Sequence, residues 1–461
     1  MQYISTRGSA APQPFLGVLL EGLAPDGGLY VPQEYPQISY EWLRRLLSAD
    51  YVTVAKAVLY LFIDDIPRVD LDRIIEATYT TEAFGEGIVP VKRLDSDLAL
   101  LQISNGPTLA FKDVPLQLLG NLMNYALAKE GRKLNVLGAT SGDTGSAAEY
   151  ALLGKEAVQV FMLSPYGRMS RFQQRQMYTL NAPNIHNIVI DGTFDTCQWL
   201  VKEANKDADF KARYSIGAVN SINWARIAAQ VVYYVYGYLQ TASHIGERVT
   251  FAVPSGNFGN ACAAHVARMM GLPIGKIIVA TNENDVLSNF FLTGAYKPHQ
   301  DSEVAVTSSP SMDIAAASNL ERFLFDYGMR DHYVVRQAVS TSDGFSTPED
   351  KPGSRFAIEG SRTRQVEVLN TIRKIYEIYG VVIDPHTAVA MFAGLMKKKV
   401  GMQLVVAETA QPAKFADTIR EALGFDPPVP KAYDALAELP EHTTRLAPDV
   451  EQVKQFIAAH A

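Results

Sequence analysis

Residues 249–260 read VTFAVPSGNFGN: an apolar, β-branched run, then a loop of glycine and small polar residues, then the start of a helical pattern. The same order occurs at residues 134–154 and at residues 403–423. In the blocks that begin at residues 134 and 249, a further β-branched run follows, at residues 158–162 and 276–280. Strand, loop, helix and strand make a βαβ unit. The sequence therefore predicts two α/β domains with parallel sheets and a ligand cleft between them, at the carboxyl ends of the strands.

The remaining segments differ from these blocks. A turn and a short strand are expected at residues 24–32, and helical patterns dominate residues 40–82. The pattern as a whole predicts four parts: a mainly helical N-terminal cap over residues 1–90, a smaller α/β domain over 91–215, a larger α/β domain over 216–428 and a C-terminal helical tail over 429–461.

The composition of the 461 residues excludes several classes of function. A formal net charge of −7 argues against a nucleic-acid surface, which needs a concentrated basic face. The sequence contains no run of about 18 uncharged apolar residues, which argues against a membrane span. Cys197 and Cys262 are too few for a disulfide framework, and no metal-binding motif accompanies them. With no basic and apolar leader at the N-terminus, we expect a cytoplasmic protein.

Residues 105–113 read NGPTLAFKD and contain the most informative lysine of the chain. Leu109, Ala110 and Phe111 precede Lys112, and an apolar helical pattern follows. Such neighbours are expected to remove water from the amine and to lower its pKa, and a neutral amine is the form that attacks an aldehyde. Taken alone, a lysine beside an apolar run is more often a surface residue whose stem packs on apolar side chains.

Two of the loops have the composition of anion sites, because glycine lets backbone N–H groups approach an anion and the following helix offers its N-terminus. Asp143 would repel an anion that it faced, so we expect its side chain to cap the helix instead. The alternative for the first loop is a purely structural turn, and glycine-rich composition is also common in such loops. The candidate residues are Thr140, Ser141, Gly142, Asp143 and Thr144 in the first loop, and Ser255, Gly256, Asn257, Phe258, Gly259 and Asn260 in the second.

The string from Gly106 to Asp113 resembles the cofactor-lysine signature of fold type II pyridoxal-phosphate enzymes, and it is similar in full to that of the threonine synthase family. The resemblance runs from Tyr3 to about Leu423. It implies a fold like that of the tryptophan synthase β-subunit, with pyridoxal 5′-phosphate in the cleft as a Schiff base on Lys112. It also implies that residues 255–260 hold the cofactor phosphate. Many relatives end this loop in Asp, so the contact of Asn260 is either to a backbone group or to the cofactor edge.

The resemblance implies further roles. Thr409, in the string ETAQPAKF at residues 408–415, would hydrogen-bond the pyridine nitrogen, and residues 140–144 would receive the α-carboxylate of the substrate. Many relatives carry His where this chain has Asn105 and Gln411, and neither amide titrates near neutral pH.

Other polar residues are candidates for the substrate site. Asn220, Ser221 and Arg226 belong to a stretch that resembles one near the family's active site, and Arg226 is alternatively an ordinary helix-face residue. Arg168 follows a strand and is a candidate for the substrate phosphate. His386 resembles part of a family motif, and we expect it to be a hydrogen-bonded structural residue.

The threonine synthase family converts O-phospho-L-homoserine and water to L-threonine and phosphate, in the last step of threonine biosynthesis. The resemblance therefore implies a lyase in which Lys112 both holds the cofactor and transfers protons, working as a monomer or a homodimer. One alternative is a related pyridoxal-phosphate lyase that turns phosphohomoserine, serine or threonine into a 2-oxo acid. Another is a catalytically silent binding protein, although such a protein would be expected to have lost Lys112.

Overall fold

The computed structural model describes residues 1–217, 221–341, 343–347, 351–430, 433 and 435–461. The chain divides into two units, each made of two segments of sequence. Unit 1 consists of Met1–Gly106 and Ser221–Pro428, and unit 2 consists of Pro107–Asn220 and Val429–Ala461. Within the described ranges, no helix is long and apolar enough to cross a membrane.

A six-stranded sheet forms the centre of unit 1. In spatial order its strands are β13 (Ile358–Arg362), β10 (Ile274–Thr281), β9 (Val249–Pro254), β14 (Leu404–Glu408), β4 (Leu98–Gln102) and β3 (Val91–Asp95). Neighbouring strands are parallel, except for the antiparallel pair β3 and β4. All six residues of β9 are buried, as expected for a central parallel strand with helices on both faces.

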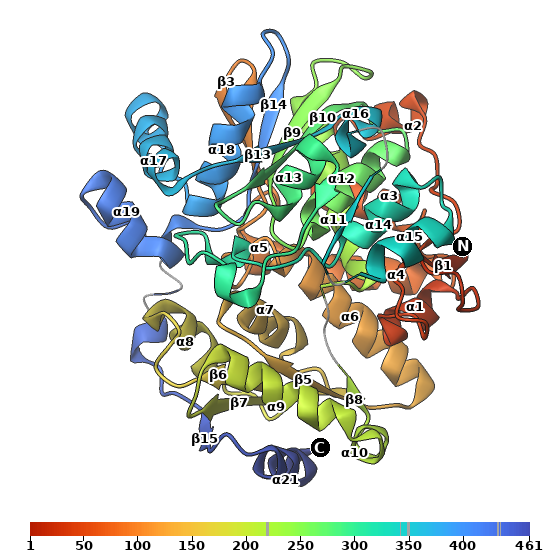
Figure 1. Cartoon of the computed structure of the whole chain (residues 1–461), viewed down its shortest axis with the longest axis vertical. Coiled ribbons are helices and arrows are strands. Elements are labelled where there is room, and N and C mark those ends of the chain that lie inside the picture. The colour runs from red at the N-terminus through yellow and green to blue at the C-terminus, as the bar shows by residue number, and fades with distance from the viewer. Residues whose placement is uncertain (218–220, 342, 348–350, 431–432, 434) are drawn as a thin grey trace. The chain divides into compact units, whose positions relative to one another are not determined.

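Helices cover both faces of this sheet (Figure 1). On one face, α18 (Pro385–Lys397) packs on β9, β10 and β14, and α17 (Gln365–Tyr379) packs on α18 and α19 (Ala416–Leu423). On the other face, α12 (Gly259–Met269) packs on β9 and β10, with α11 (Trp224–Thr241) against it.

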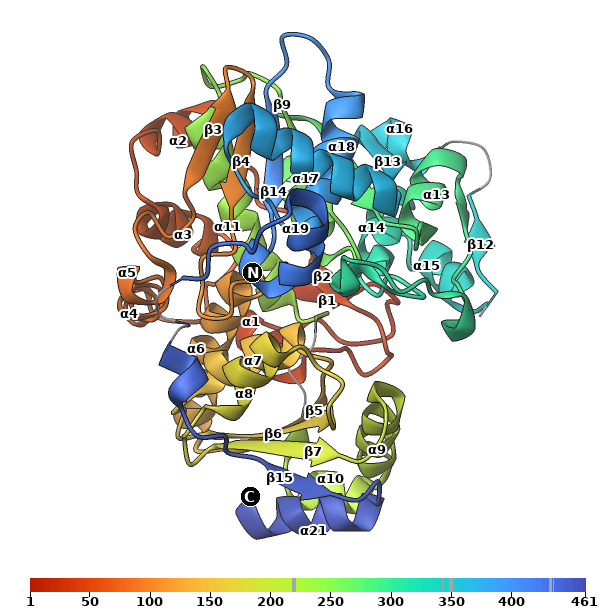
Figure 2. The same ribbon diagram turned by 90° about the vertical axis from the view of Figure 1, so that its left-hand side faces the viewer.

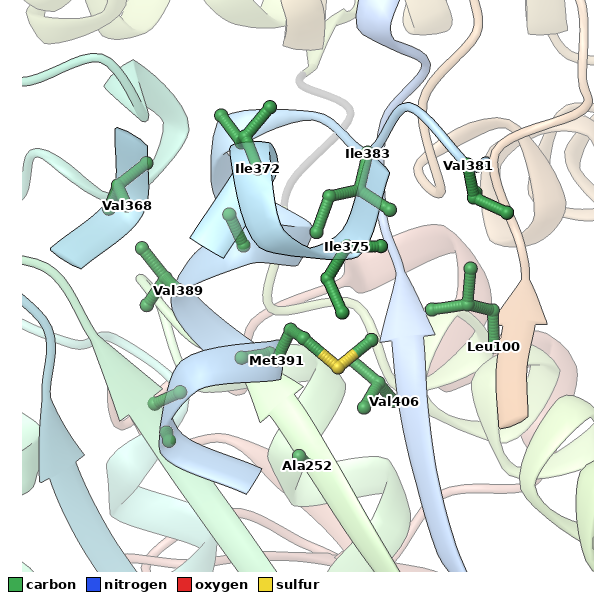
Figure 3. Close-up of a cluster of buried hydrophobic side chains, with 14 of the residues drawn as sticks. Leu100, Ala252, Val368, Ile372, Ile375, Val381, Ile383, Val389, Met391 and Val406 are labelled. Atoms are coloured by element: carbon green, nitrogen blue, oxygen red, sulfur yellow. The ribbon is translucent and has the colours of Figure 1, made fainter. Parts of the chain in front are cut away.

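A cluster of buried apolar side chains lies on the α18 side of the sheet. Figure 3 shows the strand residues Leu100, Ala252 and Val406 facing Ile375 of α17 and Met391 of α18. All five side chains are at most 2% exposed, and burial of each of the four that are larger than alanine contributes roughly 1.5–3 kcal/mol. This packing holds the ends of β9 and β14, and hence the loops that follow them, in fixed positions.

The N-terminal segment of unit 1 is mainly helical, as its sequence predicts. It begins with a short antiparallel pair of strands, and α3 packs against α11. Its elements are β1 (Tyr3–Ser5), α1 (Phe15–Glu21), β2 (Tyr30–Pro32), α2 (Tyr40–Arg45), α3 (Tyr51–Leu59), α4 (Arg68–Thr78) and α5 (Thr81–Phe84). The remaining elements of unit 1 are α13 (Val286–Thr293), β11 (Ala295–Tyr296), η1 (Asp301–Glu303), η2 (Pro310–Met312), α14 (Leu320–Tyr327), α15 (His332–Val339), β12 (Phe345–Ser346), α16 (Pro352–Phe356) and η3 (Pro412–Phe415).

Unit 2 contains a second parallel sheet. In spatial order its strands are β15 (Thr444–Leu446), β7 (Ile185–Ile190), β6 (Val158–Pro165), β5 (Leu134–Ala139) and β8 (Ile216–Gly217). Figure 2 shows helices on both sides of these strands. The helical elements are α6 (Asp113–Glu130), α7 (Asp143–Leu152), α8 (Arg171–Tyr178), α9 (Phe194–Lys206), α10 (Ala208–Arg213), η4 (Ala435–Glu438) and α21 (Val450–His460).

The C-terminal segment completes unit 2. Val453 and Ile457 of α21 lie one turn apart and join the core between the sheet and α9, together with Leu200 of α9. The segment also contains β15, a strand that the predicted helical tail does not include. β15 pairs with β7, because the chain returns to the open edge of the sheet.

The predicted fold class is confirmed: both units are built on parallel sheets, and the N-terminal segment is mainly helical. The first two predicted loop–helix segments end as expected, at Gly154 and Gly271, both with positive φ. Strands β3 and β4 fall within the predicted smaller domain, but they pair in the larger sheet, because β4 lies beside β14. The four-part division of the chain stays a prediction.

Candidate active site

Lys112 lies at the start of α6, after a short loop that Asp113 closes. The carboxylate of Asp113 accepts hydrogen bonds from the backbone N–H of Thr108 at 2.8 Å and from its hydroxyl at 2.7 Å. Asp113 is fully buried, and Leu109 between the two residues has a φ of +57°, an uncommon conformation for a residue other than glycine. The carboxylate therefore fixes the backbone that carries Lys112.

The amine of Lys112 has an acidic neighbour within unit 2. Its Nζ lies 3.8 Å from Oδ2 of Asp143, and the two side chains are 13% and 9% exposed. The ring centroid of Phe111 lies 5.8 Å from the same nitrogen. The sequence indicates the apolar neighbours of this lysine, but it does not indicate the carboxylate, which comes from the loop after β5.

The prediction that Asp143 caps α7 is wrong. Thr140 Oγ1 accepts hydrogen bonds from the backbone N–H groups of Gly142 and Gly145, both at 2.9 Å, whereas the carboxylate of Asp143 contacts Gln173 and Lys112. The physical reason is position: Thr140 lies before the helix, where its oxygen faces the free N–H groups, and Asp143 is already the first helical residue. Gly142 has a φ of +143°, which favours glycine.

The polar side chains of the same loop have different environments. Asp143 Oδ1 accepts a hydrogen bond from Gln173 Nε2 at 3.0 Å, so this carboxylate lies between an amide donor and the amine of Lys112. Ser141 and Thr144 are exposed. The loop thus combines exposed hydroxyls with backbone N–H groups that a side chain of the loop already satisfies.

The second loop, residues 255–260, connects β9 to α12 in unit 1. It turns tightly, because the N–H of Phe258 donates to the carbonyl of Gly256 at 2.8 Å, and Phe258 has a φ of +63°. Its ring is 1% exposed and packs against Phe291 and Phe323, with centroids 5.6 and 6.1 Å away. Burial of the ring holds a backbone conformation that would otherwise be unfavourable for a residue other than glycine.

Two buried polar atoms of this loop, Ser255 Oγ and Asn260 Nδ2, have no hydrogen-bond partner among the described residues. Asn260 Oδ1 accepts from the hydroxyls of Tyr233 and Tyr234, both at 2.6 Å, which orients the amide so that its donor side stays available. Buried donors are nearly always paired. These atoms, in a loop without an acidic side chain, fit the phosphate group of a cofactor. In the sequence the two tyrosines are part of an apolar helical pattern and give no sign of this contact.

Thr409 follows β14 and is buried beside a polar cluster. Nε2 of Gln411 lies 3.0 Å from Ser104 Oγ, 3.0 Å from Asn105 Oδ1 and 3.2 Å from Glu408 Oε1. Burial raises the pKa of Glu408 to about 7, against its hydrogen bonds from Gln102 and Ser104. Asn105 and Gln411 are therefore joined by a hydrogen bond, and a titratable carboxyl group adjoins them.

Arg226 lies in the first turn of α11 and is buried with no acidic partner among the described residues. It is 4% exposed, its Nε and Nη1 have no hydrogen-bond partner in the described part of the chain, and burial lowers the pKa of its guanidinium to about 10. Gln230 Nε2 donates to the carbonyl of Arg226 at 3.0 Å, and the hydroxyl oxygen of Tyr233 lies 3.0 Å from Gln230 Oε1. These contacts reach only the backbone carbonyl of Arg226. The burial of its guanidinium with Nε and Nη1 unpartnered among the described residues favours an anion-binding role over that of an ordinary helix-face residue.

The other predicted residues are spread over both units. Arg168 is exposed in the turn after β6, and the carbonyl of Ser221 accepts from Asn319 Nδ2 at 3.4 Å. Asn257 is exposed and its carbonyl accepts from the N–H of Asn319 at 3.1 Å. Gly259 begins α12. Asn220 lies outside the described residues. In the ranges that the structure covers, no group of His, Cys, Asp and Glu side chains could hold a metal ion.

Comparisons with known proteins agree with these features. Residues 2–79 match the family model "Threonine synthase N terminus", residues 88–407 match "Pyridoxal-phosphate dependent enzyme", and residues 387–457 match "Threonine synthase, C-terminal". A threonine synthase from Methylobacillus glycogenes is 50% identical, with all of both chains covered, and one from Corynebacterium glutamicum is 47% identical, with 99% of this chain and 98% of the relative covered.

A solved structure has the same fold over the whole length. The crystal structure of pyridoxal-phosphate-bound threonine synthase from Brucella melitensis has a TM-score of 0.96 and 42% identity, and the match covers 100% of this chain and 99% of that chain. Full-length matches in both sequence and fold show the family. This chain belongs to the threonine synthase family of pyridoxal-phosphate-dependent lyases.

Proposed function

We propose that this chain converts O-phospho-L-homoserine and water to L-threonine and phosphate, with Lys112 as the residue that binds pyridoxal phosphate covalently. The single observation that supports the proposal most directly lies in residues 255–260. Their two buried, unpartnered polar atoms fit a cofactor phosphate, in a chain whose relatives are threonine synthases. The cofactor residues of this proposal are Lys112, Ser255, Gly256, Asn257, Phe258, Gly259, Asn260 and Thr409.

When bound, pyridoxal phosphate supplies an electron sink that stabilises negative charge on the substrate. The hydroxyl of Thr409 would meet the pyridine nitrogen, and a hydroxyl does not force protonation there as a carboxylate would. Ser255 and Asn260 would donate to the phosphate, together with backbone N–H groups at the start of α12. Tyr233 and Tyr234 support this by holding the amide oxygen of Asn260.

Lys112 is the proposed acid–base group. With the cofactor held by the substrate amine in its place, the amine of Lys112 would remove the Cα proton and would carry protons at the neighbouring carbons. Asp143, 3.8 Å from Nζ, stabilises the ammonium form and so keeps each accepted proton on Lys112 until it is passed on.

The substrate anions need separate sites. For the α-carboxylate we assign the loop after β5, where Ser141 and Thr144 offer exposed hydroxyls. For the substrate phosphate, Arg226 is the strongest candidate, because its guanidinium is buried with two nitrogens unpartnered among the described residues. The full set of proposed substrate residues is Thr140, Ser141, Gly142, Asp143, Thr144, Arg168, Asn220, Ser221 and Arg226.

Replacement of the lysine tests the proposal. Lys112→Ala should lose the visible absorbance of lysine-bound cofactor, and phosphate release from phosphohomoserine should fall by a factor of about 10²–10⁴ or more. Lys129→Ala is the matched control, because this lysine is exposed near the other end of the same helix. An unchanged spectrum in Lys112→Ala would refute the assignment. Product analysis separates the reactions: threonine supports the proposal, and 2-oxobutyrate supports the lyase alternative.

We further propose that the enzyme acts in the cytoplasm as a monomer or a homodimer. Cys197 and Cys262 are both free and buried, which suits a reducing compartment. Sedimentation of the purified protein distinguishes the two oligomeric states, and an assembly larger than a dimer would contradict the proposal.

A further inference from the structure

His386 and Asp384 form a buried pair at the start of α18. Asp384 is the N-cap of this helix, and its Oδ1 accepts from the backbone N–H of His386 at 2.8 Å. The same oxygen lies 2.9 Å from Nδ1 of the imidazole, and the two residues are 0% and 3% exposed. A carboxylate at Nδ1 places the ring proton there, so Nε2 of the neutral ring is an acceptor.

The acceptor of His386 holds the backbone of another segment. The N–H of Ser311 donates to Nε2 at 3.3 Å. Ser311 lies in the middle of η2, which is also tied on its other side: Asn282 Nδ2 lies 2.8 Å from Thr307 Oγ1 and 2.7 Å from Asp313 Oδ1. Asn282 therefore holds the residues on both sides of the turn, and His386 contacts the backbone at its centre.

The backbone of η2 packs against Gly256 in the loop at residues 255–260, the proposed phosphate loop. A Cβ atom at Gly256 would lie 2.7 Å from the carbonyl oxygen of Ser311 and 3.2 Å from Cα of Met312. These atoms are backbone and cannot swing aside as a side-chain end can. The backbone of η2 consequently packs so closely against Gly256 that a shift of η2 towards the loop would displace Gly256 and the N–H groups that follow it.

We propose that His386 is a positioning residue for the phosphate loop. Its neutral imidazole fixes Ser311, and Ser311 fixes Gly256 in the place where the loop meets the phosphate of pyridoxal phosphate. This inference rests on the proposed function, since it takes residues 255–260 as the phosphate loop. It gives His386 a role beyond packing without placing it in contact with the cofactor or the substrate.

Two substitutions separate the two nitrogens of the ring. In His386→Asn the amide stands where Nδ1 was, so the contact to Asp384 is kept and the acceptor for Ser311 is lost. In His386→Gln the longer side chain can bring Oε1 to the position of Nε2, which restores the acceptor. We expect the Asn variant to bind pyridoxal phosphate about tenfold more weakly, the value of one lost hydrogen bond, and the Gln variant to recover most of that loss.

The comparison with pyridoxal, which lacks the phosphate, identifies the cause. Dissociation constants are measured by visible absorbance titration of the cofactor-free proteins, whose thermal unfolding is followed in parallel. A role through the phosphate loop predicts that His386→Asn weakens pyridoxal phosphate and leaves pyridoxal within about twofold. Equal weakening of both ligands, or weakening of neither, would overturn the inference and leave the proposed function intact.

Two further outcomes remain decisive. If the unsubstituted protein binds the two ligands equally, the phosphate-loop assignment itself is overturned, and this inference with it. If His386→Asn does not fold, Asp384→Asn takes its place, because it keeps a capping oxygen but no longer fixes the ring proton at Nδ1. That variant should show a smaller loss in the same direction, selective for pyridoxal phosphate, and an unselective loss would overturn the inference.

Discussion

The two loop–helix segments that start from β5 and β9 share a strand, a glycine-containing turn and a helix N-terminus, but their polar atoms are satisfied differently. In unit 2, Thr140 occupies the N–H groups of Gly142 and Gly145. In unit 1, Ser255 Oγ and Asn260 Nδ2 are buried with no partner among the described residues. One loop is thus closed by its own side chain, and the other leaves donors for a ligand.

The difference suits the two proposed ligands. A cofactor that stays bound through many turnovers can complete the hydrogen bonds of the loop after β9, and leaving them incomplete costs stability only in the cofactor-free protein. A substrate comes and goes in each cycle, so the loop after β5 must be stable when empty. Thr140 provides that stability, and the exposed hydroxyls of Ser141 and Thr144 remain for the substrate.

The largest expected effect comes from removing the hydrogen bonds that Thr140 makes within the loop after β5. Thr140→Val keeps the shape of the side chain but leaves two buried N–H groups without an acceptor, at roughly 1–3 kcal/mol each. We expect the free energy of unfolding of the cofactor-free protein to fall by roughly 2–6 kcal/mol, measured by urea denaturation. Thr140→Ser keeps the oxygen and should retain most of the stability. A Val variant as stable as the Ser variant would show that water replaces the threonine.

The same contrast shows what the sequence can and cannot predict. Periodicity and glycine positions locate both loops, because strand and helix patterns depend on neighbouring residues. The partners of Asp143 and Asn260 do not follow, because Lys112 and Tyr233 approach from elements distant in the sequence. The prediction that Asp143 caps α7 was wrong for a similar reason, because the sequence does not fix the residue at which the helix begins. Composition shows that the loop contains three residue types that can cap, Thr, Ser and Asp, and only the observed start of α7 selects Thr140.

The two units also differ in the acidic residues near these loops, Asp143 in unit 2 and Glu408 in unit 1. Asp143 has the amine of Lys112 at 3.8 Å, whereas Glu408, beside Thr409, contacts the amide of Gln411 and the hydroxyl of Ser104. Burial raises the pKa of Glu408 to about 7, from an ordinary value of 4.5. The folded protein therefore binds this proton more tightly than the unfolded chain does. The resulting stability is complete below pH 4.5 and is lost as the pH rises through 7.

Glu408→Gln removes the titrating group and so tests whether its contribution to stability falls as the pH rises. The free energy of unfolding of the unsubstituted protein, relative to the variant, should fall by about 3 kcal/mol between pH 4.5 and pH 7, and should then change little with pH. Urea denaturation of both proteins across this range measures the difference. A difference that stays constant would mean that the carboxyl group titrates near its ordinary value, and one that grows with pH would mean that folding lowers its pKa.

The smallest expected effect concerns the loop after β9, residues 255–260. Gly256→Ala places a methyl group 2.7 Å from the carbonyl oxygen of Ser311, and the overpacking should cost roughly 1–3 kcal/mol of stability. Gly259→Ala is the matched control, because its methyl group would meet Asn319 at 3.4 Å, an ordinary contact, in the first turn of a helix. The cofactor-free Gly259→Ala protein should therefore be as stable as the original. If it nevertheless binds pyridoxal phosphate more weakly, the cofactor itself requires the glycine, and the donors left unpaired in this loop are donors to its phosphate. If both variants bind the cofactor as tightly as the original does, residues 255–260 do not hold its phosphate. The proposed difference between this loop and the loop after β5 would then be wrong.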